Sequence, residues 1–342
     1  MKSNKYDTQK IPIVKPENYT KEETNKHNTS TDKLPEAKAK HIKTKKKNKF
    51  KKAFTSFLLI LTIIFLTVSV GLYAIFSRLS YEPSDNRINI NMHNITCGIY
   101  NILLIGTDKE DNGHSRSDSM ILISIDNNSD SIKMISFLRD MWVDIPDNGS
   151  GRLNSAFSIG GPQLLIDTLE SNFDIQIDNY VLIDFEMFKK LIDELGGITV
   201  EISEKEAKFI NRTTKATVNP GENNLNGYEA LVYCRIRKLD SDFMRTQRQR
   251  KVISAIIDKI KNQSIITTAS TGINILPLIT TDISPAKMTI KTPVLISSIN
   301  NDVVQLRIPA DNTYENKTIN SQAVLVADFD KNKELINEFI YN

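Results

Sequence analysis

Arginine is concentrated in one short segment of this chain. RIRKLDSDFMRTQRQR, residues 235–250, contains five of the twelve arginines, namely Arg235, Arg237, Arg245, Arg248 and Arg250. The first 52 residues, by contrast, contain sixteen lysines and no arginine. A guanidinium group is a planar fork of donors that binds a phosphate or carboxylate at two points, which an ammonium group cannot do. The segment is therefore a candidate anion site, although many basic runs are simply solvated helix surfaces.

The spacing of apolar residues indicates how these arginines point. From about Asp242 onward, isoleucine and valine recur at helical intervals and form one stripe. Arg245 and Gln249 fall on the continuation of that stripe, with Arg248 at its edge. A helix that turns arginines inward at its first turn requires an anion there, because an unpaired buried charge is too costly. The amides and the dipole of the helix N-terminus favour the same anion.

The other arginines of the segment have simpler geometry. Arg235 and Arg237 are two positions apart, so in an extended segment they point the same way. Arg250 lies off the apolar stripe, and we expect it to be solvated.

Charged residues also stand at the ends of three predicted strands. They are Asp108 after residues 100–106, Arg116 and Asp118 before residues 119–126, and Arg139 and Asp140 after residues 131–138. An antiparallel arrangement of these strands can gather the charges at one rim of a sheet. A single acid at a strand end is usually a turn or cap residue, but two arginines with several carboxylates are harder to explain in that way. The arginines together indicate a doubly or triply charged ligand such as pyrophosphate.

The order of the predicted elements favours an α/β fold with a mixed central sheet covered by helices on both faces. Strand-length segments with turn residues on both sides alternate with amphipathic helical segments. The strands are residues 100–106, 119–126, 131–138, 180–185 and 198–202, the helices are 161–173 and 186–195, and a strand and a helix close the chain. We expect one domain over residues 97–342.

A membrane anchor precedes this domain. Residues 53–77 run for 25 positions without a charge, which is enough to cross a hydrocarbon core of roughly 30 Å. The segment is longer than the apolar core of a cleaved signal peptide. We therefore expect a single-pass protein of the cell membrane.

Charge indicates the orientation. Residues 1–52 have sixteen Lys and six acids, a net charge of +10, and the whole chain is +3, which leaves −7 for residues 53–342. The basic flank of a span stays in the cytoplasm, so the domain at 97–342 is expected to be extracellular. The lysine-rich residues 1–52 should be disordered, and residues 78–96 should be a linker. The basic run contacts anionic lipid heads, and we expect no nucleic-acid partner.

Cysteine and histidine provide little chemistry. Cys97 and Cys234 could form a disulfide or could be two small buried hydrophobes, and the sequence leaves both open. There is no CxxC motif, and His114 alone among four histidines lies near a suggestive motif. A zinc site or a Ser-His-Asp hydrolase is therefore disfavoured.

Several motifs together resemble one family. In chain order they are GTD, SRSDSMILISID, ISFLRDMWVDIP, RLNSAFSIGGP, DNYVLIDFEMFKKLIDELGGITVEI, LNGYEALVYCRIR and DFMRTQRQRKVI. This set is similar to the LytR-CpsA-Psr family over nearly the whole outer domain. Two departures are Cys234 and the FMR that replaces the commoner F-G-R. Members of the family move a glycopolymer, such as teichoic acid or capsule, from undecaprenyl pyrophosphate to peptidoglycan in Gram-positive cell walls.

The resemblance implies a role for each matched residue. The pyrophosphate would be held by Arg116, Arg139, Arg235, Arg237, Arg245, Arg248 and Gln249. Asp108 and Asp118 would serve Mg²⁺ (or Mn²⁺), which prefers oxygen ligands. Arg139 would neutralise charge on the transferring phosphoryl group. Asp118, Asp140 and Asp242 all remain candidates for the general base. A polyprenyl-phosphate-binding regulator and a lipid pyrophosphate hydrolase are the alternative functions.

Overall fold

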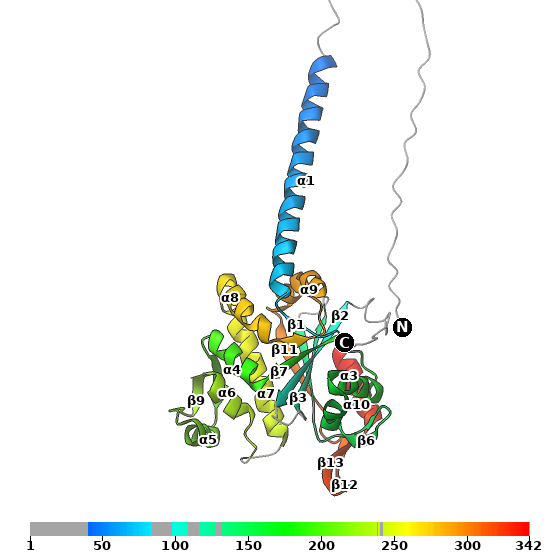
Figure 1. Ribbon diagram of the computed structural model, residues 1–342, viewed down its shortest axis with the longest axis vertical. Coiled ribbons are helices and arrows are strands. Elements are labelled where there is room, and N and C mark those ends of the chain that lie inside the picture. Colours follow the sequence, from blue (N-terminus) through cyan, green and yellow to red (C-terminus); the bar gives the residue numbers. More distant parts are fainter. Residues whose placement is uncertain are drawn as a thin grey trace, which may run out of the picture. The chain divides into compact units, whose positions relative to one another are not determined.

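The computed structural model forms two units, residues 1–62 and 63–342 (Figure 1). The predictions made for the first 39 residues and for Cys97 and His114 lie outside the described residues. The structure describes residues 40–83, 98–108, 116–126, 131–237, 239 and 242–341.

Helix α1 (Lys40–Phe76) contains the predicted anchor. Its 23 residues from Phe54 to Phe76 are long and apolar enough to cross a membrane. The helix begins at Lys40, so the prediction of disorder was wrong for residues 40–52. Lysine is a good helix former, and extending an existing helix costs far less than starting one.

Within the described residues, seven strands form the central mixed sheet, in the order β1-β10-β7-β2-β3-β4-β11. The strands β2, β3 and β4 are antiparallel neighbours, whereas β7 pairs parallel with β2 and β11 pairs parallel with β4. The bounds are β1 Ser80–Tyr81, β2 Ile99–Asp108, β3 Arg116–Asp126, β4 Ser131–Phe137, β7 Asn179–Asp184, β10 Thr280–Thr281 and β11 Asp302–Ile308. Because β1 pairs with β10, the prediction that residues 78–96 are all linker was wrong at Ser80 and Tyr81.

Helices cover both faces of this sheet, as predicted (Figure 1). One face packs against α3 (Leu153–Phe173) and α10 (Phe329–Tyr341) through side chains such as Leu103, Met120 and Ile135. The other face meets α4 (Phe185–Glu194), α6 (Gly227–Cys234) and α7 (Asp242–Lys261). The remaining helices are α5 Glu204–Thr214, α8 Ile265–Ile275, the short 3₁₀ helix η1 Leu276–Leu278 and α9 Pro285–Ser298.

In the part of the chain that the structure describes, three hairpins lie outside the central sheet. They pair β5 (Trp142–Ile145) with β6 (Gly149–Arg152), β8 (Ile198–Ile202) with β9 (Gly221–Leu225), and β12 (Tyr314–Ile319) with β13 (Gln322–Ala327). The β8–β9 hairpin joins α4, α5, α6 and α7 in a second apolar cluster that includes Ile198, Ile210 and Val252. This cluster supports α7, the helix that carries Arg245, Arg248 and Arg250.

Glycine determines two helix boundaries that matter for the site. Helix α4 ends before Gly196 and Gly197, whose φ angles of 75° and 84° belong to the left-handed region, and this confirms the predicted stop. Helix α6 begins at Gly227, where an added Cβ would lie 2.1 Å from the carbonyl oxygen of Lys189 in α4. Glycine therefore allows α6 to approach the backbone of α4.

Candidate functional site

A β-bulge directs Asp118 towards the site. Gly106 pairs with Ser119, but Thr107 pairs with Ser117, so Asp118 is the extra residue on β3. With regular alternation Asp118 would share a face with Met120, which packs in the core against α3. The bulge instead places Asp118 beside Ser119, and both side chains line one cleft on the opposite face.

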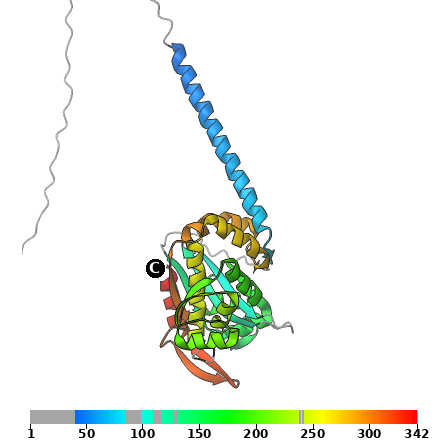
Figure 2. The same ribbon diagram turned by 90° about the vertical axis from the view of Figure 1, so that its left-hand side faces the viewer.

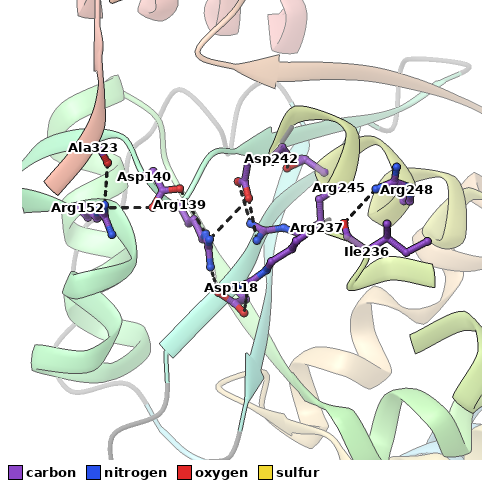
Figure 3. Close-up of polar contacts among 11 residues, drawn as sticks. Asp118, Arg139, Asp140, Arg152, Ile236, Arg237, Asp242, Arg245, Arg248 and Ala323 are labelled. Atoms are coloured by element: carbon purple, nitrogen blue, oxygen red, sulfur yellow. Dashed lines mark hydrogen bonds and ion pairs between the residues drawn. The ribbon is translucent and has the colours of Figure 1, made fainter. Parts of the chain in front are cut away.

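Asp118 is bonded to two arginines from distant parts of the chain (Figure 3). Its Oδ1 accepts a hydrogen bond from Nη1 of Arg139 at 2.6 Å, and its Oδ2 accepts one from Nη2 of Arg237 at 2.7 Å. Arg139 follows β4, and Arg237 follows α6. The predicted convergence of the start of β3 with the residues after β4 is therefore confirmed.

Arg139 extends the cluster to two further carboxylates. Its guanidinium lies 3.5 Å from Asp140 and 3.7 Å from Asp242. Arg245 then binds Asp242 through both terminal nitrogens, at 2.8 and 2.9 Å. Arg245 is only 2% exposed, which confirms that the first turn of α7 aims this arginine inward. Arginines and aspartates alternate through the cluster, as Figure 3 shows.

Burial and neighbouring charge separate the carboxylates chemically. Burial acts to raise the pKa of Asp118, but the hydrogen bond and charge of Arg139 and the charge of Arg237 hold it below the ordinary value. For Asp242, burial prevails over the charges of Arg245 and Arg139, and its pKa is raised. Burial also lowers the pKa of Arg245 to about 10. Asp242 is thus the stronger base of these two aspartates.

The cleft beside this cluster has an apolar interior. The sheet contributes Leu104, Ile121 and Ile183 to its wall, and α4 contributes Phe185 and Phe188. Together with side chains of α6 and α7, they surround about 870 Å³ of space, including the open mouth. The polar residues on the same cleft are Asp118, Asp184, Ser119, Arg235, Arg237, Arg245 and Gln249.

Arg235 and Gln249 both line this cleft, but Arg235 is the C-cap of α6, with φ −98° and ψ 3°, and does not lie in the extended segment that the spacing predicted. Arg235 is exposed at the end of α6, and its guanidinium stacks on the ring of Phe185 at 4.5 Å. Gln249 is one helical turn after Arg245, so both side chains reach the same cleft.

Arg248 lies elsewhere. Its Nε donates to Oε1 of Glu206 at 2.6 Å, its Nη1 donates to the carbonyl of Ile236 at 3.1 Å, and the residue is 2% exposed. Three residues turn a helix by about 300°, so Arg248 is displaced by roughly 60° from Arg245 towards α5. The assignment of Arg248 to the pyrophosphate is not supported by this geometry, since a carboxylate already supplies its anion.

Glu206 was missed in the sequence. The pattern Ser203-x-x-Glu206 is visible as a capping box, and the structure contains both of its hydrogen bonds. Nothing in the pattern showed that the same carboxylate also binds Arg248 in α7.

Arg250 corrects a second expectation. The prediction of a solvated side chain was wrong, because Arg250 is partly buried and its Nε donates to Gln305 of β11 at 3.0 Å. Burial and the charge of Arg307 lower its pKa. The flank of α7 that carries Arg250 faces β11, and periodicity within one helix cannot reveal such a neighbour.

The candidate metal ligands come from paired strands. Asp108 at the end of β2 pairs with Arg116, two positions before Asp118; the side chain of Arg116 lies outside the described residues. Among the residues that the structure describes, no group of three or more His, Cys, Asp or Glu side chains could hold a metal. A cation at Asp108 and Asp118 would therefore depend on substrate oxygens, and Mg²⁺ commonly binds with one or two carboxylates and phosphate.

Cys234 takes no part in this chemistry. It is a free, buried thiol, and burial raises its pKa to about 12. It packs in the apolar cluster of α6 and α7 as a small hydrophobe. Of the two possibilities that the sequence left open for Cys234, the structure supports the small buried hydrophobe; Cys97 lies outside the described residues.

Known proteins share both the sequence and the fold. The chain is 33% identical over 237 residues to the polyisoprenyl-teichoic acid–peptidoglycan teichoic acid transferase TagU of Oceanobacillus iheyensis, covering 64% of this chain and 72% of TagU. It is 32% identical over 248 residues to the regulatory protein MsrR of Staphylococcus aureus (strain COL), covering 71% of this chain and 75% of MsrR.

Solved structures agree with these relatives. A structure of TagT bound to LIIa-WTA matches with a TM-score of 0.61 and 28% identity, over 76% of this chain and 96% of the other. The LytR-CPS2A-psr family protein YwtF (TagT) with bound octaprenyl pyrophosphate lipid matches with a TM-score of 0.56 and 26% identity, over 71% and 90%. The family model LytR_cpsA_psr matches residues 77–338. The chain is therefore a member of the LytR-CpsA-Psr family.

Proposed function

We propose that this protein transfers an anionic glycopolymer from a polyprenyl pyrophosphate carrier to peptidoglycan. One observation carries the proposal: the apolar cleft opens onto Asp118 and the guanidinium groups of Arg235, Arg237 and Arg245. An undecaprenyl chain matches the apolar walls, and a pyrophosphate matches the arginines. TagU is named as a transferase of this class, and a TagT structure contains octaprenyl pyrophosphate.

The transfer is a displacement at phosphorus. A hydroxyl oxygen of peptidoglycan forms a bond to the phosphorus attached to the glycopolymer, and the bond from that phosphorus to the bridging oxygen breaks. Undecaprenyl phosphate leaves with the bridging oxygen, and the hydroxyl proton passes to a carboxylate. Arg139, Arg237 and Arg245 are placed to neutralise the charge that develops on the phosphoryl oxygens.

Asp242 is the best of the three candidate bases. Its raised pKa gives it a greater proton affinity than Asp118, whose pKa is lowered by Arg139 and Arg237 against the effect of burial. Asp118 suits the role of a permanently ionised group that positions arginines. Asp140 contacts both Arg139 and Arg152, and we assign it the same positioning role.

We further propose that Mg²⁺, or Mn²⁺ in its place, assists the reaction. Asp118 lines the cleft, and Asp108 stands at the end of the paired strand β2. These two carboxylates, with phosphate oxygens and water, would form the ligand set. A bound divalent cation would neutralise phosphate charge beside the arginines.

The apolar part of α1 is proposed to anchor the protein in the cell membrane. The lysine-rich segment before it favours a cytoplasmic N-terminus, with the domain outside the cell. This orientation would place the cleft on the side of the membrane where peptidoglycan lies.

Two other functions make different predictions. MsrR is named a regulatory protein, so a regulator that signals through its N-terminal tail should lose its effect when residues 1–39 are deleted. A transferase should keep wall attachment in that variant. A pyrophosphate hydrolase should release free glycopolymer phosphate whether or not peptidoglycan is present.

The decisive experiment is reconstitution. The full chain in lipid nanodiscs would be incubated with a lipid-linked glycopolymer and peptidoglycan fragments, and the products would be analysed by mass spectrometry. We expect a phosphodiester-linked conjugate and undecaprenyl phosphate. Undecaprenyl phosphate with free polymer, and no conjugate, would contradict transfer and identify a hydrolase.

A further inference from the structure

A second groove adjoins the cluster and shares no lining residue with the apolar cleft. It is lined on one side by Asp140, Asp242 and Phe243 and on the other by the β12–β13 hairpin. The space between them is about 790 Å³, including the open mouth. Arg139 connects the two sites, since it contacts Asp118 in the cleft and also Asp140 and Asp242 in the groove (Figure 3).

The hairpin is fixed to the residues beside Arg139. The backbone amide of Leu325 donates to the carbonyl of Asp140 at 3.0 Å. Arg152 donates to the carbonyl of Ala323 at 2.7 Å and also lies 3.6 Å from the Asp140 carboxylate. The hairpin projects from the rest of its domain (Figure 2). Its wall of the groove is therefore positioned by the same loop that positions Arg139.

The groove differs from the cleft in charge and in polarity. Two aspartates face it, and Lys317, the basic residue among those lining it, is already paired with Glu315 at 2.8 Å. Both aspartates are paired with arginines that lie behind them, Asp140 with Arg139 and Arg152 and Asp242 with Arg139 and Arg245. No arginine is among the residues that line this groove, whereas three arginines line the cleft and can bind a pyrophosphate. Carboxylates instead accept hydrogen bonds from neutral hydroxyl groups.

The other lining residues are two polar side chains of the hairpin, the ring of Phe243 and four aliphatic side chains, namely Leu138, Ala323, Val324 and Leu325. Asn316 and Thr318 offer an amide and a hydroxyl from the hairpin. The ring of Phe243 offers an apolar surface, and it is held by Tyr314 at 5.5 Å and by Arg307 at 4.4 Å. Sugar rings present both hydroxyl groups and C–H faces, which match these two kinds of surface.

We infer that this groove binds the peptidoglycan glycan strand that accepts the polymer; the inference rests on the proposed function. An in-line displacement at phosphorus requires the attacking and leaving oxygens on opposite sides of that atom. Separate sites for the lipid carrier and the acceptor, joined through Arg139, allow the two oxygens to approach from different sites. An acceptor hydroxyl in the groove would meet Asp242, the carboxylate whose proton affinity is raised.

A bulky substitution tests the groove in the full chain in nanodiscs. Thr318→Trp would fill the groove from an exposed hairpin position, and Gln322→Trp would place the same side chain on an exposed hairpin residue outside it. Transfer rates would be measured against peptidoglycan concentration, and the affinity for undecaprenyl pyrophosphate would be measured by calorimetry. We expect Thr318→Trp to raise the KM for peptidoglycan by at least about tenfold and to leave the lipid Kd unchanged. Gln322→Trp should change neither value.

The outcomes separate the inference from the function on which it rests. An unchanged KM in Thr318→Trp, or a lipid Kd that weakens in parallel, would overturn the groove assignment while transfer by the parent protein stands. If the parent itself forms no conjugate, the proposed function fails, whatever the variants do. A photoreactive p-benzoylphenylalanine at position 318 should capture glycan fragments of peptidoglycan, and the same probe at position 322 should not.

Discussion

Nη1 of Arg139 lies 2.6 Å from Oδ1 of Asp118. The second residue after β4 is therefore hydrogen-bonded to the bulge residue of β3. Burial acts to lower the pKa of Arg139, but the hydrogen bond that it donates to Asp118 and the charges of Asp242 and Asp118 raise it. The guanidinium is therefore held in place by carboxylates before any phosphate arrives. Such preorganised donors stabilise developing charge without having to reorient during the reaction.

Arg237→Ala should weaken binding of undecaprenyl pyrophosphate by more than about tenfold, because a charge-assisted hydrogen bond contributes roughly 1.5–3 kcal/mol. The Arg237 side chain is 50% exposed, so its removal should leave the thermal unfolding temperature nearly unchanged. Calorimetry would measure the affinity. Arg212→Ala, on an exposed part of α5, is the matched control and should bind normally.

Arg248→Ala should lower the free energy of unfolding. Removing one member of a buried ion pair costs about 3–5 kcal/mol, because it leaves Glu206 as an uncompensated charge. Urea unfolding would measure this loss. If Arg248 held the pyrophosphate instead, the variant would fold normally and lose affinity.

The same ion pair should depend on pH. Burial acts to raise the pKa of Glu206, but hydrogen bonds from Arg248 and Ser203 hold it below the ordinary value of 4.5. A lowered folded-state pKa gives stability that is complete above the ordinary value and is lost as pH falls through the folded-state value. The difference in unfolding free energy between the parent and Arg248→Ala should therefore shrink below about pH 4.5.

Asp242 should determine the acidic limb of the rate–pH profile. A general base works only when ionised, and burial raises the pKa of Asp242, so the limb should lie above the pH at which an ordinary aspartate titrates. Asp242→Asn should cut kcat by about 100-fold or more and remove this limb. A limb that persists in the variant would assign the base to another residue.

Asp118→Asn should reduce the dependence of transfer on Mg²⁺. The substitution removes the charge from a carboxylate that also accepts bonds from Arg139 and Arg237, so arginine positioning should be impaired as well. Titrating Mg²⁺ against transfer rate, and Mg²⁺ binding by calorimetry in the presence of undecaprenyl pyrophosphate, would distinguish the two effects. An unchanged Mg²⁺ affinity would remove Asp118 from the metal site.

Gly227→Ala should move α6 away from α4. The new Cβ would lie 2.1 Å from the Lys189 carbonyl oxygen, so the backbones must separate. We expect a destabilisation of about 1–3 kcal/mol, as for other overpacked sites. Gly272→Ala is the matched control, because Gly272 lies within helix α8 and an added Cβ would meet open space, so this variant should not lose stability.

Much of this architecture could be predicted from local pattern. The alternation of strand and helix gave the mixed sheet, and the helical period of α7 showed that Arg245 and Gln249 share a buried face. Strand order is harder to infer. For example, β11 pairs with β4 although residues 138–301 lie between the two strands in the sequence. The end of α3 was predicted at residue 173, but its start at Leu153 was not, since Gly160 and Gly161 leave helical geometry and interrupt the period.

The wrong predictions for Arg248 and Arg250 share one physical cause. Periodicity shows that a side chain points inward, but not which element it meets. Arg248 and Arg250 both lie on α7, and their partners Glu206 and Gln305 come from α5 and β11. The bulge that places Asp118 on the cleft face could not be predicted either, because it depends on how β2 and β3 are paired. The groove beside the β12–β13 hairpin could not be predicted from the sequence, because its lining residues are brought together only by tertiary contacts.

The separation of the cleft from the groove has a kinetic consequence. Because the two sites share no lining residue, the lipid-linked donor and the glycan can occupy the protein together. The polymer can then be transferred directly from the donor to the acceptor, without a covalent intermediate on a protein side chain. Steady-state rates measured at several concentrations of each substrate should give intersecting double-reciprocal lines, the pattern of a ternary complex, and no polymer should become covalently attached to the protein.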